Sequence, residues 1–316
     1  MTKLQVLSVA NLSPVYMESM LAHYTVHQRL HESDPAEFAR VAPGIVAIAA
    51  SGESKVGAAL MDQLPALKII SVMGVGYDGV DVAAAKARGV VVTHTPGVLN
   101  DDVADLAIAL MLALSRQIAR ADRYVRAGEW AAKGPMPLGR KMSGARLGIV
   151  GIGRIGQAIA TRAEAFNMSI AYTARSPRAA LPYAFHPTPA ALAAQSDYLV
   201  VITPGGAATR KLIDAEVLKA LGPQGALINV ARGSVIDEAA LIAALQNGTI
   251  AGAGLDVFEA EPNVPEALRA LDNVVLTPHI GSATTQTRRA MAELAFANLH
   301  AQLEGRPLVT PVPECQ

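Results

Sequence analysis

The sequence predicts an α/β protein made of two doubly wound parallel-sheet domains. Short runs rich in β-branched residues alternate with Ala-rich helical stretches along the whole chain. The runs are almost wholly apolar, as expected of strands that are buried on both faces of a parallel sheet. With 316 residues, 51% of them hydrophobic, the chain is long enough for two domains with large cores.

The elements of the first predicted domain come before a long helix. We expect strands over residues 4–9, 44–50, 68–73 and 90–95. The helix that follows, over about residues 101–120, begins with Asp101 and Asp102, where the helix dipole favours acidic side chains. A loop rich in Gly, Pro and Lys over residues 131–143 then separates the two series of elements.

The second series forms a complete sheet. We expect six strands, over residues 147–150, 169–174, 198–203, 226–230, 251–257 and 274–277, which with connecting helices make a doubly wound sheet. A helix over residues 284–303 and a proline-rich end follow it. We therefore expect this tail to return to the first domain, which is then discontinuous. The alternative is two consecutive domains with a peripheral tail.

The charge balance and the cysteine content exclude several classes of protein. Lys plus Arg and Asp plus Glu number 27 each, so no net field attracts nucleic acid or an anionic membrane. Cys315 is the only cysteine, which favours a reducing compartment. The first residues are typical of a strand and not of a secretory signal, and the most apolar stretch is too short to span a bilayer. We expect a cytoplasmic protein that binds neither nucleic acid nor membrane.

A glycine fingerprint indicates a dinucleotide site. Gly151, Gly153 and Gly156 form a GxGxxG motif that directly follows a strand and opens a helix. Gly151 allows the tight turn, Gly153 lets a pyrophosphate approach, and Gly156 lets helix and strand pack closely. The free amides of the helix start, with Arg154 and Ile155, then face the anion. The motif alone is a weak signal, and its place between strand and helix gives it weight.

The residues after the next strand favour NADP(H) over NAD(H), with NAD(H) still possible. The acid that usually binds the ribose, about 20 residues beyond the fingerprint, is absent. Arg175, Ser176 and Arg178 stand there instead and could bind a 2′-phosphate. The alternative is that these arginines lie on a solvated loop.

Three segments place polar residues just after buried strands. They contain Arg232, Glu261 and His279, which should converge because carboxyl ends of parallel strands meet at the cofactor crevice. A guanidinium grips a carboxylate, a histidine gives a proton to a carbonyl oxygen as hydride arrives, and a neighbouring carboxylate favours the imidazolium. The alternatives are a surface ion pair for Arg232, a turn at Glu261 and a satisfied loop histidine.

The motifs together resemble one family. NVARGSVID, LDVFEAEP and LTPHIGSAT, with VGIGRIGQAIA and VGYDGVD, match in order the motifs of the D-isomer-specific 2-hydroxyacid dehydrogenases. The resemblance covers essentially the whole chain. It implies a catalytic triad of Arg232, Glu261 and His279, and usually a homodimer. It also implies a Rossmann nucleotide domain, residues 99–285, inserted into a discontinuous flavodoxin-like substrate domain, residues 1–98 and 286–316.

Residues 95–130 are similar to the NADPH-preferring glyoxylate/hydroxypyruvate reductases of this family. That resemblance implies glyoxylate and hydroxypyruvate as substrates and a D product. It also implies that amides near Val75 and Gly76 receive the substrate carboxylate, and their glycine-rich turn after a strand independently permits a close approach. Asp256 is expected to bind the nicotinamide carboxamide, although a buried aspartate that caps backbone groups is the competing account. We also expect cofactor contacts at Thr203, Val230 and Ser282, and we predict no metal site.

Two other functions remain open at this point. The same scaffold could act on a longer, sugar or phosphorylated 2-oxo acid, although Lys55 is the one cation seen near the expected site for a phosphate. A dinucleotide-sensing, corepressor-like binding protein is the other, but such proteins usually carry long disordered tails. The apolar loop with Trp130, Met136 and Leu138 is expected to be buried against a second subunit, because an exposed apolar patch is a liability.

Overall fold

The computed structural model describes residues 3–316, and the chain divides into two compact units. One unit runs up to Leu99 and resumes with Thr284–Gln316, and the other comprises Asn100–Ala283. The prediction that one domain is inserted into a discontinuous one is therefore confirmed.

The discontinuous unit has a five-stranded parallel sheet with strand order β2-β1-β3-β4-β5. This order is that of flavodoxin-like sheets, as predicted. The strands are β1 (Gln5–Ser8), β2 (Thr25–Gln28), β3 (Ile45–Ser51), β4 (Ile69–Met73) and β5 (Val91–Thr93). The helices are α1 (Pro14–His23), α2 (Leu30–Ser33), α3 (Pro35–Val41), α4 (Ala58–Met61), α5 (Val82–Ala87) and α14 (Thr285–Leu303), with short 3-10 turns at Ala42–Gly44 and Pro313–Cys315.

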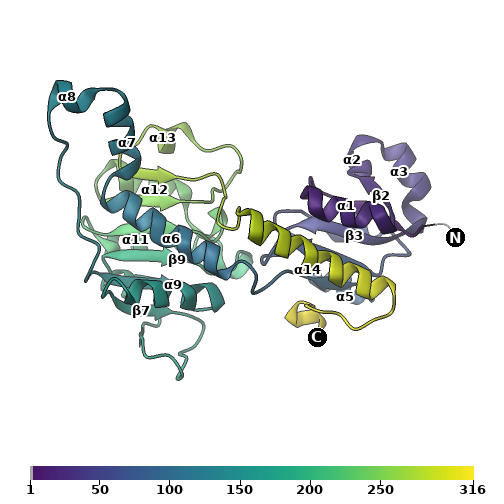
Figure 1. The fold of residues 1–316 in the computed structure, drawn as a ribbon. Helices are drawn as coiled ribbons and strands as arrows, with labels where there is room; N and C mark the ends of the chain where they lie inside the picture. Colours follow the sequence, from purple (N-terminus) through teal and green to yellow (C-terminus); the bar gives the residue numbers. More distant parts are fainter. Residues whose placement is uncertain (1–2) are drawn as a thin grey trace. The chain divides into compact units, whose positions relative to one another are not determined.

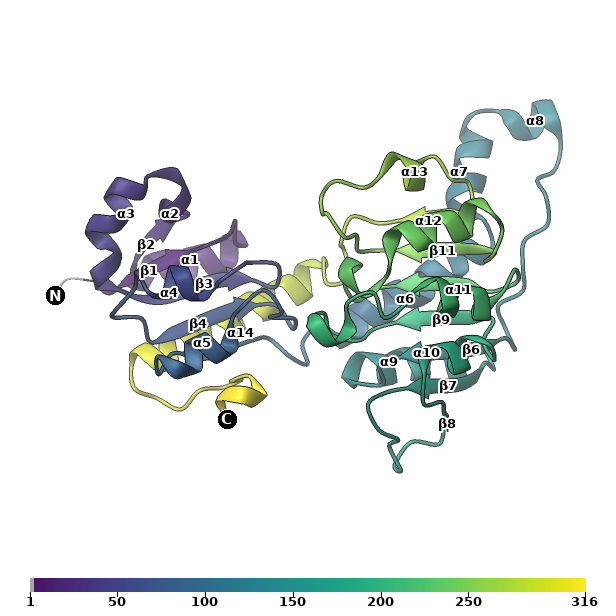
Figure 2. The ribbon, with the colours of Figure 1, turned by 180° about the vertical axis from the view of Figure 1, so that it is seen from behind.

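Helices cover both faces of this sheet. Helices α1 and α14 lie on one face in Figure 1, and α4 and α5 lie on the other in Figure 2. Helix α14 buries Met291, Ala295 and Leu299, which are spaced four residues apart and so share one face, together with Ala292 beside them. The Ser71 hydroxyl of β4 donates to the Ala295 carbonyl at 2.8 Å, which fastens the returning helix to the sheet.

The inserted unit has a seven-stranded sheet with strand order β12-β11-β10-β9-β6-β7-β8. The strands are β6 (Arg146–Val150), β7 (Ser169–Thr173), β8 (Ala184–Phe185), β9 (Tyr198–Val201), β10 (Ala226–Asn229), β11 (Gly252–Leu255) and β12 (Val274–Leu276). All neighbouring strands pair in parallel. The order reverses between β6 and β9, which makes the topological switch point of a Rossmann sheet.

Helices α6 (Asn100–Ser115) and α9 (Arg154–Glu164) pack on one face of this sheet. Helices α10 (Pro189–Ala193), α11 (Ala215–Leu221) and α12 (Glu238–Gln246) cover the other (Figure 2). The remaining elements are α7 (Ile118–Arg126), α8 (Glu129–Lys133), α13 (Glu266–Arg269) and 3-10 turns at Ala207–Thr209 and Gly233–Val235. Within residues 3–316, no helix combines the length and the apolarity that crossing a membrane requires.

Three sequence predictions about elements were wrong. Strands β2 and β8 were missed: β2 is a polar edge strand and β8 has only two residues, so neither shows a buried apolar run. The long helix ends at Ser115, because Gln117 adopts a left-handed conformation with φ of 52° that an α-helix cannot continue. The loop predicted over residues 131–143 begins inside α8.

Candidate active site

The residues predicted to bind the cofactor or to act in catalysis within the inserted unit follow the carboxyl ends of parallel strands. The fingerprint follows β6, Arg175 follows β7, and Thr203 follows β9. Val230 and Arg232 follow β10, Asp256 and Glu261 follow β11, and His279 and Ser282 follow β12. Since these strands are parallel, their carboxyl ends form one edge of the sheet, where ligands of such folds bind.

The fingerprint fits a dinucleotide phosphate. Gly151 has φ of +102°, and a Cβ there would lie 2.9 Å from the Ile202 carbonyl oxygen and the Thr203 amide. A Cβ on Gly156 would lie 2.2 Å from the Gly151 carbonyl oxygen, so only glycine lets α9 start so close to the strand. Gly153 is exposed at the N-cap of α9 with no atom within 4 Å of where its Cβ would stand. The first amides of α9 have no partner within the helix and are available to an anion.

The candidate 2′-phosphate residues lie on a solvent-exposed segment. Arg175, Ser176 and Arg178 are all exposed, as is Arg154 at the start of α9. Ile155, Thr203 and Ser282 are partly buried, and Val230 is buried. Among residues 3–316, no acidic side chain forms an ion pair with Arg175 or Arg178.

Arg232 is held by a tight turn at the end of β10. The Asn229 amide group, almost fully buried, donates to the Arg232 carbonyl at 3.0 Å and accepts from the Ala231 amide at 3.0 Å. The Arg232 guanidinium donates to the Ala231 carbonyl at 2.8 Å. A Cβ on Gly233 would lie 1.9 Å from the Phe258 carbonyl carbon, so glycine is required for the turn to meet the loop that carries Glu261.

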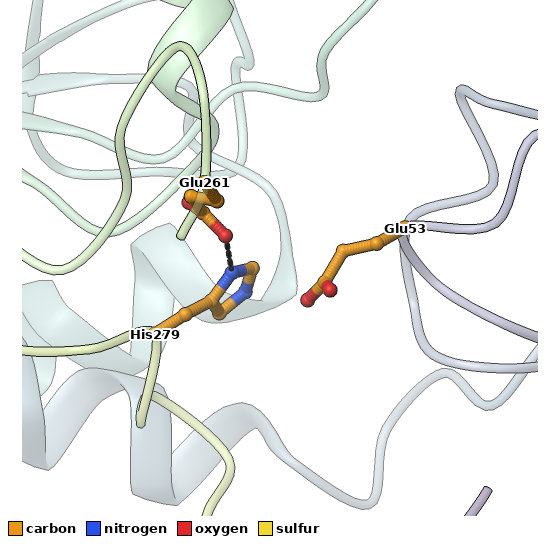
Figure 3. A group of neighbouring side chains, drawn as sticks. All are labelled: Glu53, Glu261 and His279. Carbon is orange, nitrogen blue, oxygen red and sulfur yellow. Dashed lines mark hydrogen bonds and ion pairs between the residues drawn. The ribbon is translucent and has the colours of Figure 1, made fainter. Parts of the chain in front are cut away.

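Glu261 and His279 form a hydrogen-bonded pair (Figure 3). The His279 Nδ1 lies 2.7 Å from the Glu261 Oε2, and the Glu261 Oε1 accepts from the Phe258 amide at 2.9 Å. The two side chains are 27% and 26% exposed, so the pair is reachable from solvent but partly shielded from it. His279 has φ of +53°, a left-handed conformation that is uncommon for residues other than glycine.

The electrostatics at Glu261 place all three predicted catalytic residues in one neighbourhood. Burial by itself would raise the pKa of Glu261. The hydrogen bonds from His279 and the Phe258 amide, together with the positive charges of His279 and Arg232, outweigh it and lower the pKa below its usual value. The carboxylate is therefore ionised at neutral pH. Its charge favours the protonated form of the imidazole beside it.

Asp256 organises the loop that carries His279. Its carboxylate accepts from the Thr277 hydroxyl at 2.6 Å and from the amides of Ile280 and Gly281, both at 2.8 Å. The His279 amide donates to the Asp256 carbonyl at 2.9 Å. Burial raises the pKa of Asp256 above its usual value, although these hydrogen bonds and the His279 charge act in the opposite direction. The structure thus contains the capping contacts of the competing account, and a contact of Asp256 with the carboxamide stays a prediction.

Val75 and Gly76 belong to the discontinuous unit, in the turn after β4. A Cβ on the preceding Gly74 would lie 2.8 Å from the Gly52 Cα, so the turn packs backbone against backbone. Both Val75 and Gly76 are partly buried. The His94 Nδ1 lies 3.0 Å from the Val75 carbonyl oxygen, which fixes the direction of this turn.

Sequence reasoning missed the residues that hold the site together. Asn229 and Gly233 lie inside the motif that supplied Arg232, and their neighbours in that motif were the available signal. The Thr277 hydroxyl gave no signal, because its partner Asp256 lies 21 residues away in the sequence. The Phe258 amide gave none either, because it meets the Glu261 carboxylate only in the folded loop.

Comparison with known proteins identifies the relatives of this chain. The model of the NAD binding domain of the D-isomer specific 2-hydroxyacid dehydrogenases matches residues 108–281. The chain is 49% identical over 268 residues to glyoxylate/hydroxypyruvate reductase A of Arabidopsis thaliana, which covers 85% of each chain. It is 43% identical to the 2-ketogluconate reductase of Gluconobacter oxydans over 98% of this chain and 99% of that protein.

A solved structure shows the same fold. It is the NADPH-dependent glyoxylate/hydroxypyruvate reductase of Sinorhizobium meliloti in complex with NADP and malonate. The TM-score is 0.93 and the identity 47%, over 99% of this chain and 98% of that one.

Proposed function

Because the chain belongs to the D-isomer-specific 2-hydroxyacid dehydrogenase family, we propose that it reduces small 2-oxo acids, above all glyoxylate and hydroxypyruvate, to D-2-hydroxy acids with NADPH. Its relatives make it an NAD(P)-dependent oxidoreductase. The observation that carries the proposal is the Glu261–His279 hydrogen bond of 2.7 Å at the carboxyl edge of the sheet, within reach of the Arg232 charge. That set contains a proton donor, its partner and a carboxylate-binding cation.

The proton is assigned to His279. A bound reduced nicotinamide supplies the hydride for the keto carbon. The Nδ1 of His279 is engaged with Glu261, so the proton that passes to the keto oxygen is the one on Nε2. Glu261 keeps the ring charged and fixes its plane.

The substrate carboxylate is assigned to a cation and to backbone amides. Arg232 grips it and stabilises the negative charge that develops on the keto oxygen. The amides of Val75 and Gly76 are proposed as further donors to the substrate carboxylate. The support is the turn after β4, where the absence of a Cβ on Gly74 lets the backbone pack closely against Gly52.

NADPH is the proposed cofactor, with NADH as a weaker alternative. The support is an exposed segment with Arg175, Ser176 and Arg178 and no carboxylate that would repel a 2′-phosphate. The similar Sinorhizobium meliloti enzyme is NADPH-dependent and holds NADP. We assign the pyrophosphate to Gly151, Gly153, Arg154, Ile155 and Gly156. The remaining proposed contacts are Thr203, Val230, Ser282 and, for the carboxamide, Asp256.

We further propose that the protein is a cytoplasmic homodimer. The segment from α7 to Leu138 exposes apolar side chains that a monomer would leave in water: Val125 is 57% exposed, Trp130 63% and Leu138 97%. A second copy that covers them would remove this liability. The lone Cys315 suits a reducing compartment.

A panel of substrates tests the proposed function. NADPH oxidation is followed with glyoxylate, hydroxypyruvate, a longer 2-oxo acid, a phosphorylated one and 2-ketogluconate. The last is included because a 2-ketogluconate reductase matches nearly the whole chain, which favours a sugar acid as the second candidate. We expect glyoxylate and hydroxypyruvate to give the largest kcat/KM. Tight NADPH binding without turnover of any 2-oxo acid contradicts the proposal and favours a dinucleotide-sensing protein.

A further inference from the structure

The segment that follows β7 carries the proposed 2′-phosphate ligands on an otherwise exposed loop. Residues 175–178 are all exposed, whereas Tyr172, three residues before Arg175, is only 1% exposed. Binding a phosphate requires that the exposed arginine side chains, and the loop backbone that carries them, lose conformational freedom, and this loss costs free energy. A feature that holds the backbone of this loop in place before the cofactor arrives would reduce that cost.

One buried hydroxyl supplies such a feature. The Arg178 amide donates to the Tyr172 phenolic oxygen at 2.7 Å, which closes a ring of backbone from residue 172 to residue 178. The Leu181 amide then donates to the Arg178 carbonyl at 3.0 Å, so a turn follows at once. Arg175 and Ser176 belong to the segment that this hydrogen bond closes.

The Tyr172 ring is itself fixed in position. Its strand is paired on both sides, with Ile149 of β6 and with Phe185 of β8 opposite Tyr172. The Phe185 ring lies against it, with centroids 5.5 Å apart and planes inclined by 58°. Tyrosine has only two side-chain torsions, so packing that fixes the ring also fixes the hydroxyl. The hydroxyl is thus a rigid anchor in the core that reaches the backbone of a surface loop.

We propose that Tyr172 is a positioning residue for NADPH specificity: its hydroxyl sets the loop of Arg175 and Ser176 in the conformation that receives the 2′-phosphate. The inference rests on the proposed use of NADPH. Tyr172 touches neither substrate nor the reacting atoms, and it acts through the Arg178 backbone. Loss of its oxygen affects only a ligand that carries the 2′-phosphate.

The test is Tyr172→Phe, which keeps the ring and its packing and removes one oxygen. We expect the KM for NADPH to rise about 3- to 10-fold, the range that loss of one ordinary hydrogen bond produces. The KM for NADH and the kcat at saturating NADPH should stay unchanged. Calorimetry should show the same loss for adenosine 2′,5′-bisphosphate and none for adenosine 5′-monophosphate, which isolates the phosphate from catalysis.

Tyr198→Phe is the matched control. Tyr198 is also 1% exposed in the same sheet, and its hydroxyl lies 2.7 Å from the Ser115 hydroxyl, not near the cofactor loop. It should lower stability without changing the ratio of the two cofactor KM values. An equal change for NADPH and NADH in Tyr172→Phe, or no change for either, overturns the inference.

A third variant separates this inference from the proposed function. If the wild type does not prefer NADPH and Arg175→Ala changes the KM of neither cofactor, the NADPH assignment itself is wrong. If the wild type prefers NADPH, Arg175→Ala abolishes the preference and Tyr172→Phe preserves it, only the role of Tyr172 is wrong.

Discussion

Glu261→Gln tests how the catalytic pair works. The carboxylate of Glu261 is held by two hydrogen bonds, from the His279 Nδ1 at 2.7 Å and from the Phe258 amide at 2.9 Å. A glutamine has one acceptor oxygen in place of two, so it can satisfy one of these donors and presents its own N–H groups to the other. It also removes the negative charge that favours the imidazolium.

The size of the effect follows from the charge on this hydrogen bond. A hydrogen bond to a charged group contributes about 1.5–3 kcal/mol, and one pH unit corresponds to about 1.36 kcal/mol. The basic limb of the pH profile of kcat/KM, where the donor loses its proton, should therefore move by about 1–2 pH units toward acid. Some activity should survive at low pH, because His279 is still present.

Stability should follow the same charge. The pKa of Glu261 is lower in the folded protein than its usual value, so its contribution to stability is present above the unfolded-state pKa. That contribution disappears as the pH falls through the folded-state pKa. The difference in unfolding free energy between wild type and Glu261→Gln should thus be largest at neutral pH and shrink in acid.

The assay is the pH dependence of NADPH oxidation with saturating cofactor and a fixed 2-oxo acid. Glu259→Gln is the matched control, because Glu259 lies two residues away and pairs with Arg210 at 2.9 Å instead of with His279. The control should keep the wild-type profile. If the basic limb of Glu261→Gln coincides with that of the wild type, the reasoning about this pair is refuted.

Three further predictions concern the cofactor, the loop at Asp256 and the assembly. Arg175→Ala should raise the KM for NADPH and leave that for NADH almost unchanged, and equal wild-type efficiency with both cofactors would contradict the assignment. Asp256→Asn should lower the free energy of unfolding by about 1–3 kcal/mol, since the asparagine side chain has one oxygen in place of the two that accept from the backbone N–H groups of Ile280 and Gly281; an unchanged denaturant midpoint would contradict this prediction. Light scattering at micromolar concentration should give twice the monomer mass, and replacing Trp130 and Leu138 by serine should weaken that assembly, whereas a wild type with only the monomer mass refutes the dimer.

The sheet architecture was predictable because its signal is local. Strands such as β3, β4 and β10 are buried over nearly their whole length, so each appears as an apolar run. The fingerprint was predictable because its glycines stand at a fixed spacing between a strand and a helix, although the contacts that require Gly151 come from the distant Ile202 and Thr203. The edge strand β2 escaped because an exposed edge needs no apolar run.

The contacts that set the site geometry were not predictable from local patterns. The loop that carries His279 is held by Asp256, which lies 23 residues earlier and meets this loop only when β11 and β12 pair. The break after Ser115 has no Gly or Pro to announce it, while the Ser115 hydroxyl bonds to Tyr198, a residue 83 positions away. These contacts are set by tertiary packing between residues far apart in the sequence, so a short stretch of sequence does not reveal them.

The most direct measurement of the central claim compares wild type with His279→Ala in the NADPH-dependent reduction of glyoxylate, with NADPH binding followed in parallel. We predict turnover by the wild type and a loss of about two to four orders of magnitude in kcat for the variant, the usual effect of removing a general acid. NADPH affinity should not change, because the cofactor is assigned to the fingerprint and the loop after β7. A His279→Ala variant that reduces glyoxylate at nearly the wild-type rate would contradict the assignment of His279 as the proton donor.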